Sequence, residues 1–462
     1  RRHTRFTSDW SSDVCSAELP RQRVVAQRDA ILTLDWHISR THTRNTVTQR
    51  RQTWSWAMYD WANSAFATTV MAGFFPLFFK LHWSQGVEVT QTTYYLGVGN
   101  SIASLVIVIL APILGAMADT GALRKRMLAA FACLGLLATG ALYLVEAGMW
   151  PFAILLYTIA VVGFSGANTF YDALLVIISA VSKRHRVSAL GFALGYLGGG
   201  LLFLVNVLMY LFPHWFGLTD GTEAIRWAFI TVALWWAVFS IPIFLWVDEP
   251  MPASGRRRVD ITGTFAALAQ TARNLRQYRG AWLFLLAYWL YIDGVDTIVR
   301  MAVDYGLNIG LGQENLIIAL LMVQFIGFPA AIVFGRLGER YGARRGIWIA
   351  IWTYVGVTVF AYFMDSAIEM YILAAVIGLV QGGIQALSRS MFSQLIPPEK
   401  GAEFFGFYNV VGKAAAVFGP FLMGLVTLST GDPRIGILSI LVLFFAGMLV
   451  FRKVQEPNTN QP

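Results

Sequence analysis

The sequence has little charge for its length. Asp, Glu, Lys and Arg make up 13% of its 462 residues, whereas soluble globular domains carry roughly 25%. Hydrophobic residues make up 56%, and the mean hydropathy is +0.58. Side chains with so little polar surface cannot cover a water-soluble body of this size, but lipid tolerates an apolar exterior. The composition therefore excludes an ordinary soluble protein and predicts an α-helical protein that spans a membrane.

Motifs for nucleotide, metal or covalent chemistry are also missing. The two cysteines, Cys15 and Cys133, form neither a disulfide framework nor a paired zinc motif. The sequence contains no G-x-x-x-x-G-K-[ST] loop and no H-E-x-x-H helix, so nothing indicates ATP-driven pumping or a catalytic metal. Ser388 and His185 do not fit a nucleophile–base pair. We expect no enzyme activity, no cofactor and no metal.

The charges that are present are mostly basic and recur in alternate loops. The net charge is +9, which could indicate a nucleic-acid partner, but membrane proteins gather Lys and Arg in their cytoplasmic loops, and we expect no nucleic acid. Under that rule both termini are cytoplasmic, in a bacterial cytoplasmic membrane or, in a eukaryote, a vacuolar membrane. The basic clusters are Arg124–Arg126, Lys183–Arg186, Arg256–Arg258, Arg340 with Arg344–Arg345, and Arg452–Lys453.

Apolar segments of about 20 residues, the length that crosses a bilayer, recur along the chain. We predict twelve spanning helices. They cover residues 57–81, 94–118, 127–147, 151–180, 187–211, 225–247, 281–303, 314–335, 346–363, 367–390, 403–429 and 434–451.

The longest polar interruption, residues 248–280, divides these spans into six and six. It contains Pro250, Pro252 and the run Arg256–Arg258. We predict an N-terminal six-helix bundle over 51–247, a cytoplasmic linker over 248–280, a C-terminal six-helix bundle over 281–455 and a tail over 456–462.

Residues 1–50 do not match the rest of the chain. They are polar and basic, without helical or strand periodicity and without a long apolar run. The tract Ser11–Pro20 resembles a translated sequencing adapter. Two interpretations stay open, a disordered cytoplasmic tail and a segment that is foreign to the natural protein, and no function is drawn from either.

A loop motif is repeated after the second span of each half. The second copy, Gly335–Arg345, reads GRLGERYGARR and fits G-x-x-x-[DE]-R-x-G-x-[RK]-[RK], while the first copy, Gly115–Arg126, matches in part. The glycine permits close helix approach, and the acid can pair with Arg and a neighbouring helix end to hold one side shut. The alternative is that these charges only set the orientation of the chain in the membrane and lie beside an ordinary turn. The gate candidates are Gly115, Asp119, Arg124, Gly335, Glu339, Arg340, Gly342, Arg344 and Arg389.

This repeated loop resembles the signature of the major facilitator superfamily. That resemblance implies two pseudo-symmetric six-helix bundles around a central cavity. Three further segments, 56–66 (WAMYDWANSAF), 191–200 (GFALGYLGGG) and 382–408 with its GGIQALSRS and EFFGFY runs, resemble the vacuole-effluxer-like branch. This branch includes a fungal vacuolar amino-acid effluxer linked to autophagy. The resemblance implies a secondary transporter, and amino acids only weakly.

Polar residues within the predicted spans are functional candidates, because charge is costly at membrane depth. The resemblance implies that the first, fourth, seventh and tenth spans line the cavity, and these carry much of the polarity. Asp293, Asp296 and Arg300, spaced by three and four, share one helix face. The candidates for substrate or proton binding are Asp60, Asn63, Asn168, Asp172, Asp293, Asp296, Arg300, Gln324, Gln381, Gln385, Asn409 and Lys413.

Several roles stay open for these groups. Asp293 and Asp296 either form a structural triad with Arg300 or bind a proton or a substrate ammonium. Asp60 and Asp172 are either gate acids or substrate and proton sites, and Arg389 is a gate residue. A carboxylate partner, such as that of an amino acid, suits Lys413.

We therefore expect a small-solute permease that works by alternating access in the bilayer. Amino acids are the first candidate and proton coupling is a further one. A facilitator or exporter of sugars or other metabolites, or a non-transporting receptor of the same fold, is the alternative. One chain supplies both halves, so a monomer could suffice.

Overall fold

The structure is a computed structural model. It describes residues 48–84, 95, 102–103, 105–107, 109–110, 113–119, 123–249, 278–308 and 310–455. Residues 51–462 form a unit separate from residues 1–50. Most of the predicted N-terminal segment 1–50 and of the predicted linker 248–280, and the tail 456–462, lie outside the described residues, as do the side chains of Arg300 and Lys413.

Every regular element in the described ranges is helical, as predicted. The first helix is described over residues 48–83; it is α-helical to residue 65 and continues as π-helix η1 (Phe66–Phe74), α2 (Phe75–Phe78) and π-helix η2 (Phe79–Trp83). In the first half α4 (Arg124–Ala141), α5 (Trp150–Ile178), α6 (Arg184–Leu211) and α7 (Gly221–Trp246) follow. The second half contains α9 (Arg279–Asn308), α10 (Gln313–Tyr341), α11 (Ala343–Tyr362), α12 (Ala367–Leu395), α13 (Gly401–Thr430), α14 (Pro433–Leu438) and α15 (Leu441–Phe451).

Eight of the described helical segments are long and apolar enough to cross a membrane. They correspond to eight of the twelve predicted spans. Of the other four, α11 and α13 are helices of 20 and 30 residues, residues 51–83 are helical throughout, and much of 94–118 lies outside the described residues. The full count of twelve stays a prediction.

Local sequence sets several of the helix ends. The Asp220 side chain accepts the Glu223 N–H at the start of α7, and Ser366 with Glu369 forms a capping box at the start of α12. Gly342, with φ of 86°, separates α10 from α11 in a conformation that favours glycine. These turns let successive helices run antiparallel.

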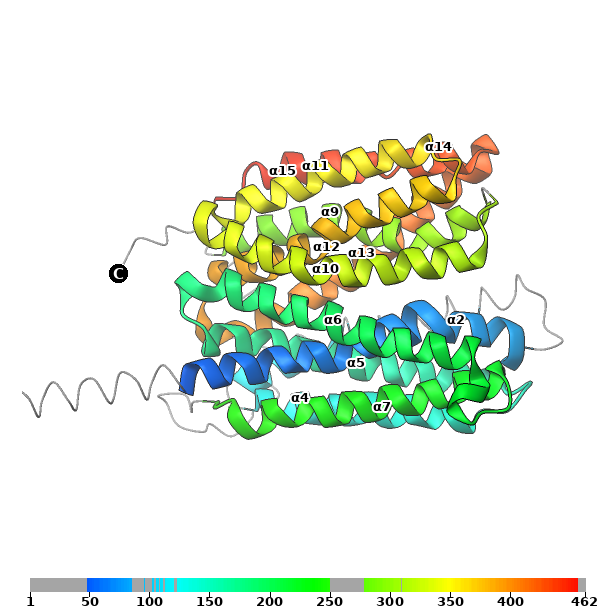
Figure 1. The fold of residues 1–462 in the computed structure, drawn as a ribbon. Coiled ribbons are helices and arrows are strands. Elements are labelled where there is room, and N and C mark those ends of the chain that lie inside the picture. The colour runs from blue at the N-terminus through cyan, green and yellow to red at the C-terminus, as the bar shows by residue number, and fades with distance from the viewer. Residues whose placement is uncertain are drawn as a thin grey trace, which may run out of the picture. The chain divides into compact units, whose positions relative to one another are not determined.

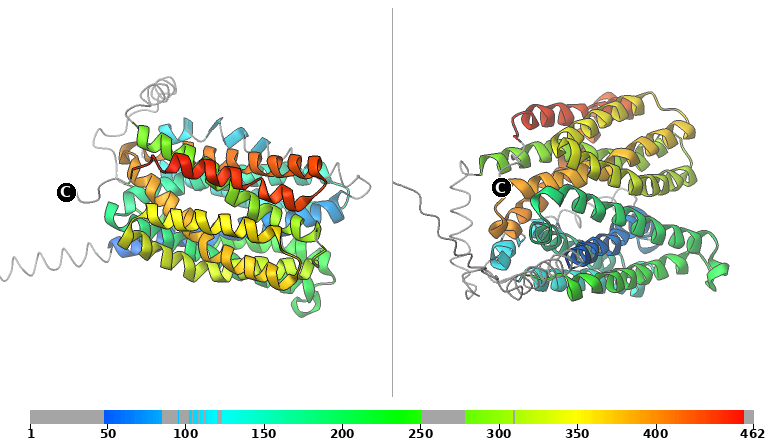
Figure 2. Two further views of the ribbon diagram at one scale, coloured as in Figure 1. Left: turned by 90° about the horizontal axis from the view of Figure 1, so that it is seen from above. Right: turned by 60° about the vertical axis from the view of Figure 1, so that its left-hand side comes forward.

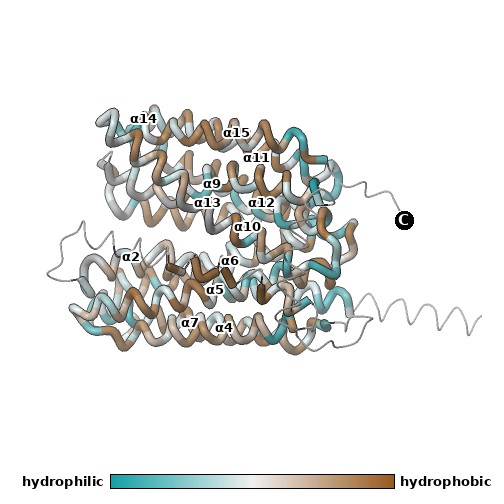
Figure 3. Tube along the Cα trace, turned by 180° about the vertical axis from the view of Figure 1, so that it is seen from behind, coloured by the Kyte–Doolittle hydropathy of each residue, from teal (hydrophilic) through white to brown (hydrophobic). Residues whose placement is uncertain are grey.

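The helices of the two halves form two groups (Figure 1). The halves meet mainly where α6 packs on α10 and α12 and where α5 packs on α13. Further views show the helices of both groups running along a shared direction (Figure 2). Apolar residues predominate along the middle of the helices, and hydrophilic residues gather at the end near the C-terminus (Figure 3). We call this the charged end and define it by Asp119, Arg124, Arg184 and Glu403, which contact residues of the other half.

Glycines allow the close packing between these helices. A Cβ on Gly163 of α5 would lie 2.4 Å from the backbone nitrogen of Gly135 on α4, so these two backbones touch. The run Gly195–Gly200 of α6 is also a packing surface: Cβ atoms on Gly195 and Gly198 would lie 2.6 Å from Ser64 Oγ and from the Trp61 carbonyl oxygen on the first helix.

Candidate functional site

A cavity of about 420 Å³ lies between the two halves and is lined by both. Helices α5 and α6 and the first helix contribute from one half, and α9, α10, α12 and α13 from the other. Most of the predicted substrate or proton residues line it. These are Asp60, Asn63, Asn168, Asp172, Gln324, Gln381, Gln385 and Asn409, together with the predicted gate residue Arg389.

The α12 lining changes in polarity along the helix. Met370, Ala374 and Ile377 line the cavity near the start of α12, and Gln381 and Gln385 follow on the same face at helical spacing. One turn later comes Arg389, toward the charged end. The cavity is therefore apolar at one end and becomes polar, then charged, at its floor.

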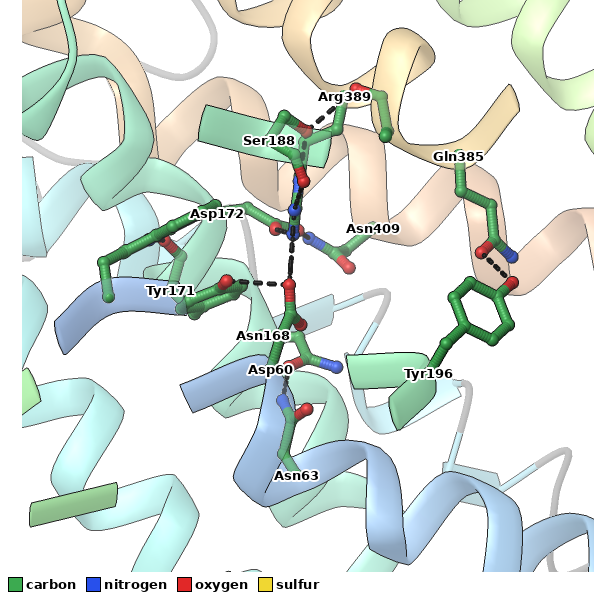
Figure 4. A network of polar contacts seen from close by, with 12 residues as sticks. Asp60, Asn63, Asn168, Tyr171, Asp172, Ser188, Tyr196, Gln385, Arg389 and Asn409 are labelled. Carbon is green, nitrogen blue, oxygen red and sulfur yellow. Dashed lines mark hydrogen bonds and ion pairs between the residues drawn. The ribbon is translucent and has the colours of Figure 1, made fainter. Parts of the chain in front are cut away.

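The floor of the cavity is an ion-pair cluster that joins the halves. Arg389 of α12 donates to the carboxylate of Asp60 on the first helix at 3.3 Å, and to that of Asp172 on α5 at 3.1 Å (Figure 4). Its remaining donors bond to the Oγ and the carbonyl oxygen of Ser188, both at 2.9 Å. Tyr171 also donates to Asp60, at 2.7 Å. We call Arg389, Asp60, Asp172, Tyr171 and Ser188 the floor cluster.

Aromatic rings enclose the guanidinium. The Arg389 Cζ lies 4.1 Å from the centre of the Phe192 ring and 4.9 Å from that of Trp56. Trp56 stacks on Tyr171 at 4.4 Å and donates its indole N–H to the Tyr171 carbonyl oxygen. Arg389 is 3% exposed. Removing water from an ion pair strengthens its electrostatic attraction but costs desolvation energy, so the cluster links the halves and is costly to break by removing one partner.

Amide side chains line the cavity above the floor cluster. Asn63 donates to Asn168 at 2.6 Å, as Figure 4 shows. Tyr196 donates to Gln385 at 3.2 Å, and this bond links α6 to α12. Amides and hydroxyls can donate and accept, so these groups can hydrogen-bond a small solute.

At the charged end the first loop copy forms a second cross-link. The Asp119 carboxylate accepts the backbone N–H groups of Ala402 and Glu403, at 3.0 and 2.9 Å, and so caps α13 of the other half. Asp119 also pairs with Arg124 at 2.6 Å. A Cβ on Gly115 would lie 2.4 Å from the Ala402 carbonyl oxygen. The close approach inferred for this glycine is confirmed.

The second loop copy is arranged differently. A Cβ on Gly335 would lie 2.4 Å from the Ala189 Cβ of α6, so this glycine also permits close approach between the halves. The side chains of Glu339 and Arg340 are exposed; Arg340 lies over the ring of Tyr341. Arg344 and Gly342 make contacts within the second half. Arg344 donates to the Arg452 carbonyl oxygen, and Gly342 ends α10.

Residues of the basic cluster at the start of α6 make the corresponding contacts between the halves. Arg184 donates to the Ser393 carbonyl oxygen at 2.7 Å, at the end of α12, and to the Val176 carbonyl oxygen of α5. The His185 ring lies 2.8 Å from Ser390 Oγ. A cation near helix C-termini is favourable. From the sequence, this cluster is expected only to set the orientation of the chain in the membrane. It is one of several basic clusters that recur in alternate loops, so nothing in the sequence indicates a contact with α12.

The asymmetry of the two loops predicts unequal mutational effects. Asp119→Asn removes a charge that accepts two backbone N–H groups and pairs with Arg124. Hydrogen bonds to a charged group contribute about 1.5–3 kcal/mol, so we expect Asp119→Asn to lower transport at least about tenfold. The matched change Glu339→Gln, at an exposed side chain, should leave transport within about twofold. Uptake in proteoliposomes tests this, and equal losses would contradict it.

Two other predicted residues do not line the cavity. Asp293, 1% exposed on α9, accepts the Gly419 N–H of α13 at 3.0 Å. The next residue, Pro420, lies inside α13, and neighbouring side chains commonly satisfy backbone groups near a proline in a membrane helix. Asp296 is half-buried on α9 and likewise lies outside the lining. Their proposed proton or ammonium role stays a prediction, as do the roles of Arg300 and Lys413, whose side chains are not described.

Some participants were not among the predicted residues. Tyr171 lies three residues after Asn168 on α5, and Ser188 and Tyr196 lie on α6. A hydroxyl in an apolar span costs far less than a charge, so composition does not single it out. The contact of α6 with α12 reveals Ser188 and Tyr196, and the bond to Asp60 of the first helix reveals Tyr171.

Comparison with known proteins identifies the family of the chain. The family model described as vacuole effluxer Atg22 like matches residues 48–461. The chain belongs to this family. A relative of the Atg22-like chain, the MFS-type transporter YxiO of Bacillus subtilis, is 38% identical over 408 residues, which cover 88% of this chain and 95% of YxiO. Autophagy-related protein 22 of Coccidioides immitis is 24% identical, over 86% of this chain and 85% of that protein.

The Atg22-like chain also resembles solved structures. The major facilitator superfamily proton:xylose symporter XylE, bound to 6-bromo-6-deoxy-D-glucose, matches with a TM-score of 0.67 and 12% identity, over 88% of this chain and 95% of XylE. At this identity the likeness shows the fold alone. The Atg22-like protein is therefore a multi-pass integral membrane protein with the major facilitator fold, and a transporter rather than an enzyme.

Proposed function

We propose that this protein is a secondary transporter that carries a small solute through the 420 Å³ cavity by alternating access. The observation that carries the proposal is the position of the cavity, which lies between the halves above a cluster of ion pairs that joins them. A rocking motion of the halves would break the floor cluster and expose the cavity at the charged end. The chain alone supplies both halves, which fits a working monomer.

The direction of this closure follows from loop charge. The basic clusters predicted to be cytoplasmic include Arg124 and Arg184, and both hold the halves together at the charged end. We infer that the charged end faces the cytoplasm and that this conformation is closed on that side. A bacterial cytoplasmic membrane is the proposed location, in keeping with the Bacillus relative.

Amino acids are the proposed solutes, and a proton is the proposed coupling ion. Two carboxylates share one guanidinium in the floor cluster, so one of them can take up a proton while the other keeps the pair with Arg389. Protonation would weaken the link between the halves and favour opening. This supports Asp60 and Asp172 as coupling residues beside the Asp293 predicted from sequence.

Counterflow of labelled amino acids in proteoliposomes, with and without a pH gradient, tests the proposal. We expect flux that follows the gradient, coupling that is lost in Asp60→Asn and Asp172→Asn, and folding that is retained because each variant leaves one acid to pair with Arg389. Asp293→Asn is compared with these two variants. If coupling is lost in Asp293→Asn and retained in the other two, the proton site lies on α9 rather than in the floor cluster.

Amino-acid flux that does not respond to the pH gradient would indicate that the protein is a facilitator without proton coupling. Absence of flux for every amino acid would contradict the substrate proposal, and the search would turn to sugars and other metabolites. Absence of transport for every solute that binds would favour the receptor alternative.

A further inference from the structure

Arg389 has no donor left for a solute. A guanidinium has five N–H groups. In the floor cluster one donates to Ser188 Oγ, one to the Ser188 carbonyl oxygen, one to Asp172, and the other two to Asp60 Oδ2. Although Arg389 lines the cavity, every one of its donors is therefore engaged within the protein. It cannot bind the carboxylate of a solute without first releasing these partners.

Acceptors, by contrast, are available at the same place. Asp60 Oδ2 takes the bonds from Arg389 and Tyr171, whereas Asp60 Oδ1 has no hydrogen-bond partner within the described residues. Among the described residues, Asp172 Oδ2 accepts only a 3.4 Å contact from Asn409. Two carboxylates against one guanidinium leave one negative charge in excess. The floor can therefore accept hydrogen bonds from a cation.

A second, independent acceptor lies about two turns from Arg389 along α12. Gln381 of α12 is 9% exposed and lines the cavity, and its Oε1 is buried without a partner in the described part of the chain. A buried acceptor that lacks a partner costs free energy until a donor reaches it. A hydrogen-bond donor on a solute bound in the cavity can supply such a partner.

The rest of the described lining offers no charge to a carboxylate. Apart from the saturated Arg389, the described side chains that line the cavity include no Lys, Arg or His. The available donors are neutral amides and hydroxyls, such as those of Gln385 and Asn168. Toward the opposite end the lining is apolar, with Leu373, Ile377 and Phe203 among its residues.

We propose that the cavity recognises its solute through a primary ammonium group, which binds at the floor cluster, and that a carboxylate on the solute is dispensable. The ligand class is an organic amine with an apolar body, and an amino acid is one case of it. This inference rests on the proposed transport function. It places the ammonium at Asp60 and Asp172, whereas the sequence suggested Asp293 and Asp296.

A matched set of four compounds tests this: phenylalanine, phenylalaninamide, phenethylamine and 3-phenylpropanoate. The first three carry the amine, and only the first and last carry the carboxylate. Stabilisation of the purified full chain against heat is the primary readout, because neutral amines cross bilayers and confuse uptake. Competition against labelled phenylalanine in proteoliposomes is the second.

We expect phenethylamine and phenylalaninamide to reach half-maximal effect at concentrations within about tenfold of that for phenylalanine. For 3-phenylpropanoate the concentration should be higher by on the order of thirtyfold or more, as for loss of one partner of a buried charge pair. Asp60→Asn should lose the response to phenethylamine. Asp172→Asn is a second variant in case the first folds poorly. Asp365→Asn also removes a negative charge, at a side chain that is 74% exposed, and should respond like the wild type.

The outcomes separate this inference from the proposed function. Binding of 3-phenylpropanoate without binding of phenethylamine would overturn the inference. So would flux of phenylalanine that phenethylamine fails to inhibit, although the transport function would then stand. Stabilisation by phenethylamine that depends on Asp60, without flux of any amino acid, would support the amine site and contradict amino-acid transport.

Discussion

Arg389→Ala is expected to abolish transport and to lower the stability of the protein. The substitution leaves the buried carboxylates of Asp60 and Asp172 facing each other without a cation. Removing one partner of a buried pair costs about 3–5 kcal/mol. It also removes the bonds to Ser188 that join α12 to α6. Thermal unfolding in detergent and counterflow in proteoliposomes measure the two effects.

Neutralising the acids should separate stability from transport. In Arg389→Ala combined with Asp60→Asn and Asp172→Asn no buried charge remains in the floor cluster, so we expect much of the lost stability to return. Transport should stay absent, because the charge that is proposed to bind the solute and the proton is gone. If the triple variant is as unstable as Arg389→Ala, the loss comes from packing against Phe192 and Trp56 rather than from unpaired charge.

Arg389→Lys refines this test. An ammonium keeps the charge but has three donors, and it cannot reach both acids and Ser188 as the planar guanidinium does. We expect its stability to lie between those of the wild type and Arg389→Ala. Transport close to the wild-type rate would show that charge alone suffices and would contradict a role for the full set of five donors.

Gly115→Ala is expected to have the second largest effect, although it adds one methyl group. That Cβ would lie 2.4 Å from the Ala402 carbonyl oxygen, a backbone atom that no side-chain rotation can move. The start of α13 must move away, and the two N–H bonds to Asp119 must lengthen. We expect the closed charged end to be destabilised and transport to fall at least about tenfold, because these are hydrogen bonds to a charged group.

Gly424→Ala is the control for this change. Gly424 lies on α13, and a Cβ there meets nothing within 4 Å. It should leave transport unchanged. Thiol labelling of a cysteine introduced at Ser393, in a chain with Cys133 and Cys15 replaced by serine, reports opening at the charged end. Faster labelling in Gly115→Ala is expected, and unchanged labelling with full transport would contradict a gate at this contact.

The repeated loop motif predicted a turn and a charge correctly, but it did not predict which of its two acids contacts the other half. Two acids in matching motifs, Asp119 and Glu339, received the same predicted role. In the structure Asp119 caps a helix of the other half, while Glu339 is exposed. The motif specifies a turn and a charge. Whether a helix N-terminus lies within reach of that charge depends on how the halves pack, and the two loops differ there.

The intramembrane acids illustrate the same limit. Asp60, Asp172 and Asp293 look alike in sequence, since each is a carboxylate in an apolar helix. Only the first two line the cavity, while Asp293 turns toward the backbone of α13 beside Pro420. A helix rotation of about 100° per residue decides between a cavity and a neighbouring helix. Sequence spacing determines which residues share a helix face, but it does not determine whether that face lies against the cavity or against a neighbouring helix.

The sequence by itself determined that this protein is an α-helical membrane protein, divided it into halves, and identified its family and most of the polar residues that line the cavity. These follow from composition, apolar segment length and local motifs, which short stretches of chain carry. Only the tertiary structure decided that Arg389 joins Asp60 and Asp172, that its donors are saturated, and that the first loop closes the charged end. These depend on contacts between residues more than 200 positions apart, and no local pattern encodes such distances.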